Sequence, residues 1–165
     1  DIHLMVDQVE VALNKLKSIR PRMISFHPQK NQNNQQIIHE IQKNCLASIA
    51  INANQKAEDY LALITQADHC LVMGVQPGLC GQQFQPSALT VLQKVYAHTQ
   101  AQKKHYQIAI DGGVNANSLP HITEKNIPIA QAIIGSALFK NGNDKHNFKQ
   151  LAPYITVVEK KEVLI

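Results

Sequence analysis

An aspartate followed by two glycines marks the stretch of this sequence best suited to chemistry. Asp111 ends the alternating run IAID, and Gly112 and Gly113 follow it directly. Backbone N–H groups at a glycine turn ahead of a helix attract phosphate, and a carboxylate at the same place can move a proton or hold a metal. The alternative is an ordinary turn in which Asp111 caps the next helix, because a short glycine motif is weak evidence on its own.

The glycines of the chain are concentrated behind predicted strands. Six of the seven follow the fourth, fifth and sixth strands in turn: Gly74, Gly78, Gly81, Gly112, Gly113 and Gly135. In a parallel α/β protein these loops open on one face, at the carboxyl ends of the strands, where ligands bind. Their concentration there predicts a phosphate site.

A histidine near the start of the chain shares the predicted inner face with the aspartate. In DIHLMV, residues 1–6, the apolar Ile2 and Leu4 alternate with His3, which therefore points the other way. His3 and Asp111 are both typical metal ligands. A single histidine on a strand is more often a core residue, and that alternative remains open.

Other soft or titratable side chains are weaker candidates. Met5 and Met73 share the inner face and are more typical of a core, although they could keep water from a reactive carbanion. His27 ends a strand and could line the same site. The remaining histidines are predicted at surface or helical positions and receive no role: His39, His69, His98, His105, His121 and His146.

Alternating strands and helices must position these residues. Strands are predicted over 1–6, 23–27, 46–52, 69–75, 106–111 and 131–136. Helices are predicted over 7–19, 56–67, 87–98, 116–124 and 144–151, with one more around Ile37, Ile38 and Ile41. This order favours right-handed βαβ units and a parallel sheet, either doubly wound or a (β/α) barrel. The tail from Tyr154 onward fits a helix or a strand equally well.

Length, charge and cysteine content limit the kinds of protein that this sequence can encode. The 165 residues suffice for one domain, but a closed barrel needs eight strands and typically ~250 residues, so two units are missing. A net charge of +4 with only two arginines and scattered lysines suits a small phosphorylated substrate as well as nucleic acid. No apolar run approaches the ~20 residues that span a membrane, and no signal peptide is predicted from these residues. The three cysteines, Cys45, Cys70 and Cys80, lack metal-type spacing and predict reduced thiols in a cytoplasmic protein.

Five motifs in order give the sequence a family resemblance. DIHLMV, FH, MGVQPGLCGQQF, IAIDGGVN and IIGSALF together resemble the ribulose-phosphate 3-epimerase family, from the first residue to about Phe139. The resemblance implies a TIM (β/α)8 barrel. This chain would be an incomplete barrel of about six β/α units, the family's strands three to eight, in a single partial domain over residues 1–165.

The resemblance also implies an activity and a site. The reaction is metal-assisted epimerisation at C3 of D-ribulose 5-phosphate to D-xylulose 5-phosphate, in the pentose phosphate pathway. It passes through an enediolate held by a divalent cation (Zn, Fe, Mn or Co), whose charge stabilises the enediolate. Asp111 would be the catalytic proton donor and a metal ligand, and His3 the other metal ligand. The sugar phosphate would lie against His3, Met5, Met73, Gly78, Leu79, Cys80, Gly81, Gly112, Gly113, Gly135 and Ser136.

Several positions depart from the family pattern. Where the family has MSVNPGFGGQ, this chain has Gly74, Gln76, Leu79 and Cys80 in place of Ser, Asn, Phe and Gly. A cysteine there offers its N–H to phosphate only if the position does not need a positive φ. The family's glutamate two residues after FH is replaced by Gln29.

The first two strands of the family have no counterpart in this sequence. They carry a phosphate-binding serine and the motif His-x-Asp-x-Met-Asp-Gly, which holds two metal ligands and the second aspartate. One hypothesis, favoured by a start without Met inside a strand, is an epimerase without its N-terminal quarter, catalytically incomplete as given.

Two other hypotheses stay open beside it. One is a non-catalytic phosphate-binding or assembly protein, favoured by the altered loop around Cys80, and the other is a hexulose-phosphate 3-epimerase. An open barrel of six strands exposes two apolar edges, which predicts poor solubility or a homo-oligomer. No nucleic-acid or membrane partner is expected.

Overall fold

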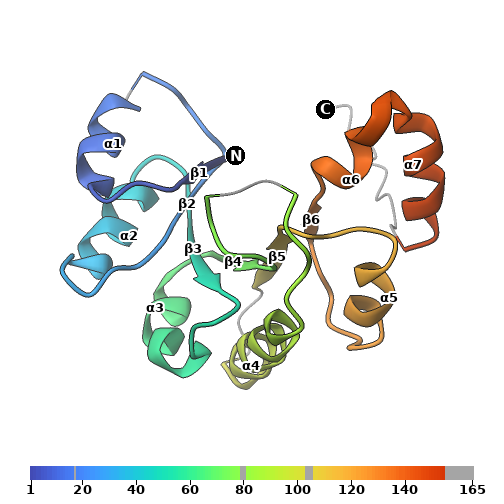
Figure 1. The fold of residues 1–165 in the computed structure, drawn as a ribbon. Coiled ribbons are helices and arrows are strands. Elements are labelled where there is room, and N and C mark those ends of the chain that lie inside the picture. The colour runs from blue at the N-terminus through green and yellow to red at the C-terminus, as the bar shows by residue number, and fades with distance from the viewer. Residues whose placement is uncertain (17, 79–80, 103–105, 155–165) are drawn as a thin grey trace, which may run out of the picture.

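The fold is a single sheet of six parallel strands, seen in a computed structural model that describes residues 1–16, 18–78, 81–102 and 106–154 (Figure 1). The sheet order follows the sequence, and each strand pairs in parallel with the next. The strands are β1 (Ile2–Leu4), β2 (Met23–Phe26), β3 (Leu46–Asn52), β4 (His69–Met73), β5 (Gln107–Asp111) and β6 (Gln131–Ile133).

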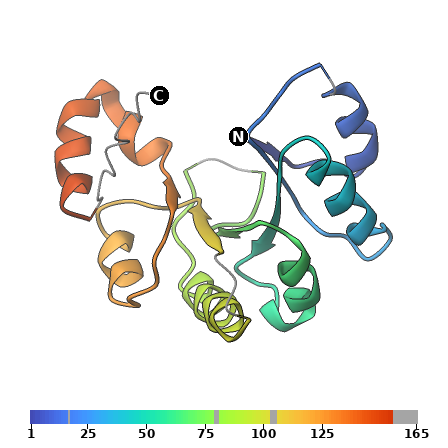
Figure 2. The ribbon, with the colours of Figure 1, turned by 180° about the vertical axis from the view of Figure 1, so that it is seen from behind.

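Helices connect the strands and lie along the outer side of the curved sheet (Figures 1 and 2). They are α1 (Val9–Lys15), α2 (Asn34–Gln42), α3 (Leu61–Gln66), α4 (Ser87–Ala101), α5 (Ser118–Thr123), α6 (Ser136–Phe139) and α7 (Asp144–Leu151). Short 3₁₀ helices add η1 (Ala57–Tyr60), η2 (Lys140–Gly142) and η3 (Ala152–Tyr154). The sheet and its helices form a curled, incomplete TIM barrel, as predicted.

The two faces of the sheet carry different side chains. The outer face packs large aliphatic residues against the helices, and Ile108 and Ile110 of β5 are buried in this core. The inner face carries a small separate cluster of Ala50, Leu71, Met73 and Ala109. The predicted alternation along IAID is therefore confirmed, and Asp111 shares the inner face with Ala109.

Most predicted elements are found, with differences at their ends. β3 and α7 have the predicted bounds, whereas β4 ends at Met73 and β6 at Ile133. The helix expected from residue 116 begins at Ser118, because the Asn115 side chain folds over the turn before it. Asn115 Oδ1 accepts hydrogen bonds from the N–H groups of Asn117 at 2.8 Å and Ser118 at 3.1 Å. The short helices after β6 were not predicted.

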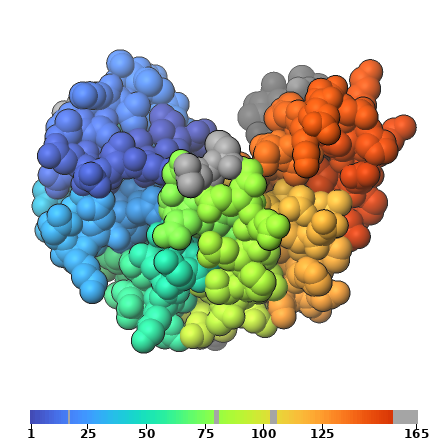
Figure 3. Space-filling view, in the orientation of Figure 1, coloured from blue at the N-terminus to red at the C-terminus, as the bar shows by residue number. Residues whose placement is uncertain are grey.

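The sheet leaves a gap between its two edge strands. In the order of the sheet, β1 pairs only with β2 and β6 only with β5. Figure 3 shows the surface hollowed between the blue β1–α1 side and the orange-red α6–α7 side. Apart from Leu46 at the start of β3, the large exposed apolar side chains belong to the first 19 residues or to the segment from β6 onward: Met5, Val6, Val11, Ile19, Ile133, Phe139, Phe148 and Tyr154. Among the described helices, none combines the length and apolar character needed to cross a bilayer.

Candidate active site

The curl of the sheet brings His3 and Asp111 together from strands that are not neighbours. His3 Nδ1 on β1 lies 3.8 Å from Asp111 Oδ2 on β5. Their side chains are 18% and 25% exposed, so both are partly buried yet reachable from solvent. This separation is too long for a direct hydrogen bond, but a carboxylate and an imidazole so placed can both ligate one cation.

A second histidine orients the first. His27 follows β2, and its Nε2 lies 2.9 Å from His3 Nε2, with the two rings stacked and their centroids 5.0 Å apart. Burial, followed by the nearby His3, lowers the pKa of His27 to about 4, so His27 is neutral at pH 7. The hydrogen bond between the rings leaves His3 Nδ1 facing Asp111. Sequence reasoning proposed only that His27 could line the site.

The predicted phosphate loops enclose a cavity of about 300 Å³ beside Asp111. Met5 and Met73 both line it; Met73 is buried, whereas Met5 is 49% exposed. The predicted site residues among its walls also include Gly78, Gly81, Gly112, Gly113, Gly135 and Ser136. Two others, Leu79 and Cys80, lie outside the described residues. The loops after β4, β5 and β6 therefore meet at one end of the sheet.

Gly113 is a position in this cavity where an added side chain would collide with the backbone of another segment. Its φ of +67° is unfavourable for any residue with a Cβ. A Cβ there would lie 2.6 Å from the backbone nitrogen of Phe84. The chain therefore passes Asp111 in a turn that only glycine fits.

One histidine lies where it was not expected. His69, predicted at a surface or helical position, is only 2% exposed and lies at the start of β4 on the inner face. Its Nδ1 is 2.9 Å from Ser48 Oγ, and burial, followed by the charge of Arg22, lowers its pKa to about 4. The alternation His69, Leu71, Met73 along HCLVM was the signal that could have placed it.

The candidate metal ligands among the described residues do not make a complete site. Among the residues that the structure describes, no group of three or more histidine, cysteine, aspartate or glutamate side chains is arranged to hold a cation. His3 and Asp111 offer two ligands, whereas protein cation sites commonly use three or more.

The fold and the site define a class of protein: a barrel-type α/β protein with a glycine-lined site at the carboxyl ends of its strands. The profile of the ribulose-phosphate 3 epimerase family matches residues 1–139, and the chain belongs to this family. The family resemblance of the sequence is thereby confirmed.

Curated relatives show how much of the family's length is present. The ribulose-phosphate 3-epimerase of Buchnera aphidicola subsp. Baizongia pistaciae is 31% identical over 144 residues, 87% of this chain and 62% of the relative. That of Escherichia coli K12 is 27% identical over 152 residues, 92% of this chain and 65% of the relative. The chain thus spans less than two thirds of the length of these relatives.

A solved structure agrees on the fold. The crystal structure of 3-hexulose-6-phosphate synthase matches with a TM-score of 0.63 over 91% of this chain and 70% of that chain. The two sequences are 13% identical, so the likeness concerns architecture alone.

Proposed function

We propose that this chain carries one half of the proton-transfer site of a ribulose-phosphate 3-epimerase. The observation that carries the proposal is the approach of His3 to Asp111. Asp111 is one of the residues that line the glycine-rich cavity, whereas His3 itself is not among them. The relatives named ribulose-phosphate 3-epimerase support D-ribulose 5-phosphate and D-xylulose 5-phosphate as the substrate pair.

Asp111 is the proposed acid and base on one face of the sugar. The C3 hydrogen of a 2-ketopentose lies next to the carbonyl carbon, so its removal leaves an enediolate and its return on the other face inverts C3. Asp111 is 25% exposed and lines the cavity, so a bound sugar can reach its carboxylate. His3 lies 3.8 Å from that carboxylate and is the proposed partner for the substrate oxygens.

The phosphate group of the sugar is proposed to bind in the glycine loops that line the cavity. Gly78 and Gly81 have positive φ and nothing within 4 Å of where a Cβ would lie, which leaves their backbone accessible to a ligand. Gly135 and Ser136 line the same cavity from beyond β6. Its volume of about 300 Å³ is at the small end of the range for ligand sites, consistent with a pentose phosphate.

A divalent cation, Zn, Fe, Mn or Co, is the proposed cofactor, and when bound it would stabilise enediolate charge. His3 and Asp111 would be its ligands from this chain. Because these two do not complete a site, efficient epimerisation needs further ligands and a second acid.

The incomplete ligand set also favours a second candidate function, a non-catalytic phosphate-binding protein of the same family. That protein would bind the sugar phosphate in the same loops without exchanging its C3 hydrogen. A hexulose phosphate as substrate is a variant of the first candidate, and the described residues do not favour it.

We propose that the chain self-associates and thereby covers the exposed edges of the open sheet. Ile133 at the edge strand β6 and Phe139 on α6 are 42% and 67% exposed, and such apolar edges favour pairing with another copy. Sedimentation equilibrium should give a mass above that of one chain, and a stable monomer at all concentrations would contradict it. Nucleic acid and membranes are not proposed as partners, and the cysteine content supports a cytoplasmic location.

Hydrogen exchange at C3 tests the proposed function. The chain is incubated with ribulose 5-phosphate in D₂O, with and without Mn²⁺ or Zn²⁺, and deuterium at C3 is followed by NMR. We expect slow exchange that Asp111→Asn lowers by about 10³-fold, because the amide neither takes nor returns a proton. The exposed Asp59→Asn serves as the matched control and should exchange like the parent chain. Binding of the sugar phosphate without any exchange would favour the non-catalytic candidate.

A further inference from the structure

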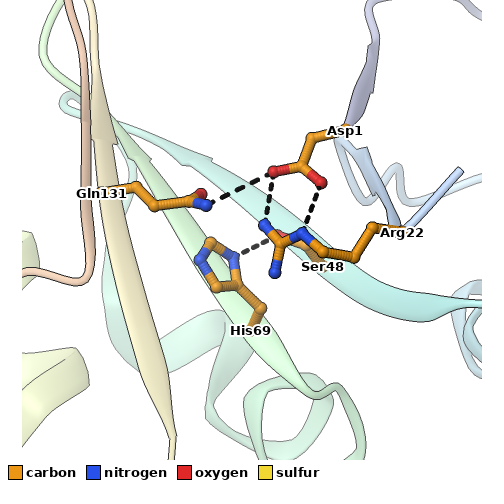
Figure 4. Close-up of polar contacts among 5 residues, drawn as sticks. All are labelled: Asp1, Arg22, Ser48, His69 and Gln131. Carbon is orange, nitrogen blue, oxygen red and sulfur yellow. Dashed lines mark hydrogen bonds and ion pairs between the residues drawn. The ribbon is translucent and has the colours of Figure 1, made fainter. Parts of the chain in front are cut away.

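A polar cluster lies at the amino end of the sheet, opposite the candidate active site (Figure 4). Arg22 Nε donates to Asp1 Oδ1 at 3.0 Å, and its Nη2 donates to Asp1 Oδ2 at 2.5 Å. Gln131 Nε2 donates to the same Oδ2 at 3.4 Å. We call this cluster of Asp1, Arg22 and Gln131 the amino-end clasp.

The clasp joins the two edges of the open sheet. Asp1 directly precedes β1, and Gln131 is the first residue of β6, 130 positions away in the sequence. β1 and β6 are not paired by backbone hydrogen bonds. The hydrogen bond from Gln131 to Asp1 therefore spans the gap that the sheet leaves open.

The clasp lies one side-chain layer below the contact between His3 and Asp111. Asp1 is two residues before His3, and Gln131 is two residues before Ile133, which is the register partner of Asp111. Residues two apart on a strand share a face and are separated by about 6.6 Å. Both contacts thus start from the β1 side of the sheet; the contact of His3 reaches β5, and the contact of Asp1 reaches β6 nearer the amino end.

We propose that Asp1, Arg22 and Gln131 are positioning residues, which fix the curl of the sheet and thereby the separation of His3 from Asp111. Arg22 holds the Asp1 carboxylate with two hydrogen bonds, and Gln131 ties that carboxylate to β6. The effect on catalysis rests on the proposed function, whereas the effect on the curl does not.

Because the clasp is exposed to solvent, we expect it to affect the curl of the sheet more than the stability of the fold. The Arg22 and Asp1 side chains are 51% and 36% exposed, and exposed ion pairs contribute little to stability. The large core on the outer face of the sheet lies away from them. Loss of the clasp should therefore loosen the curl without unfolding the chain.

The test replaces Gln131 with a residue of the same shape that repels Asp1. Gln131→Glu places a second carboxylate beside the first, and Asp1→Asn in the same chain removes that repulsion. Gln107→Glu is the matched control, because Gln107 is an exposed glutamine at the amino end of the neighbouring strand β5. Gln131→Leu removes the hydrogen bond without adding charge, in case the glutamate variant does not fold.

Two readouts separate the curl from the chemistry. Spin labels on unnatural ketone amino acids at Val11 of α1 and Phe148 of α7, both 47% exposed, report the width of the gap by pulsed EPR. C3 exchange of ribulose 5-phosphate in D₂O reports catalysis, as kcat and KM separately. For Gln131→Glu we expect a longer, broader distance distribution and a kcat lower by about 10-fold, with KM within about twofold. Asp1→Asn should reverse both changes.

Each outcome bears on a different part of the proposal. An unchanged distance in both Gln131→Glu and Gln131→Leu, or an equal change in Gln107→Glu, would overturn the positioning role. A changed distance with unchanged kcat would overturn the link from curl to catalysis. If the distance changes as expected but no variant exchanges C3 hydrogen, the clasp stands and the proposed epimerase function fails.

Discussion

The two ends of the inner face of the sheet are built by different means. At the carboxyl end, glycines with positive φ and the partly exposed Asp111 surround a cavity. At the amino end, Arg22 holds Asp1, and His69 is buried against Ser48. One end depends on backbone freedom and access, and the other on side-chain hydrogen bonds.

This difference suggests a division of roles along one short sheet, with the proposed binding site at one end and the contacts that set the shape of the sheet at the other. The same strands supply both ends, and Asp1 and His3 are only two residues apart on one of them. In barrel proteins the carboxyl end carries chemistry and the amino end carries stability. Here the amino end also sets the distance across which the carboxyl end works.

The largest effect on stability is expected at Gly113, where the carboxyl end depends on backbone freedom. Gly113→Ala would put a Cβ 2.6 Å from the Phe84 nitrogen at a φ of +67°, and we expect a loss of about 3 kcal/mol in unfolding free energy. Urea denaturation measures this loss. Gly135→Ala is the control, because nothing lies within 4 Å of its added Cβ, and it should cost less than about 1 kcal/mol. Equal losses of unfolding free energy in the two variants would show that the turn at Gly113 has no special need for glycine.

At the amino end, we expect His69 to make stability depend on pH, with a change no larger than the loss expected for Gly113→Ala. The pKa of His69 is lowered from 6.5 to about 4 in the folded chain, so the unfolded chain binds the proton more readily between these values. His69 therefore contributes no pH dependence above about pH 6.5, and stability falls as the pH drops from 6.5 towards 4, by about 3 kcal/mol at most.

His69→Gln tests this effect, since it removes the titrating ring and keeps an acceptor for Ser48. Urea denaturation at pH 7 and pH 4.5 should show a smaller difference in unfolding free energy for the variant than for the parent chain. His121→Gln, which replaces a histidine with a 66% exposed side chain, should keep the parent's difference. A variant at position 69 that loses as much stability as the parent would show that His69 is not the cause.

How far the sequence predicts this structure depends on whether a feature is local. The alternation in DIHLMV and IAID assigned His3 and Asp111 to the inner face, because strand alternation is a property of neighbouring residues. Contacts across the sheet, such as that of His27 with His3, depend on how tightly the sheet curls. No local pattern encodes that curl, so the ring stacking and the clasp were not predicted.

The wrong prediction for His69 and the failure to predict α6 have separate physical causes. His69 was assigned a surface or helical position although it begins a predicted strand, and that strand turns its ring inward. α6 is four residues long, too short to show a helical period in the sequence.

The smallest effect is expected from the ion pair of the clasp. Arg22→Lys loses the bidentate hydrogen bonding to Asp1. We expect the unfolding free energy to fall by about 0.5 kcal/mol at low salt and by less in 1 M NaCl. The exposed Arg20→Lys is the control and should change stability by less than the error of a urea titration. A loss at Arg22 that exceeds about 2 kcal/mol would mean that the amino end holds the fold together as well as its curl.

The most direct test of the difference between the two ends is an NMR titration of the chain with ribulose 5-phosphate. We predict saturable shifts of the backbone amides of Gly78, Gly81 and Gly113 at the carboxyl end, with smaller shifts for inorganic phosphate. Saturable shifts confined to the amino end, around His69 and Gln131, or no saturable shift at any concentration, would contradict the account.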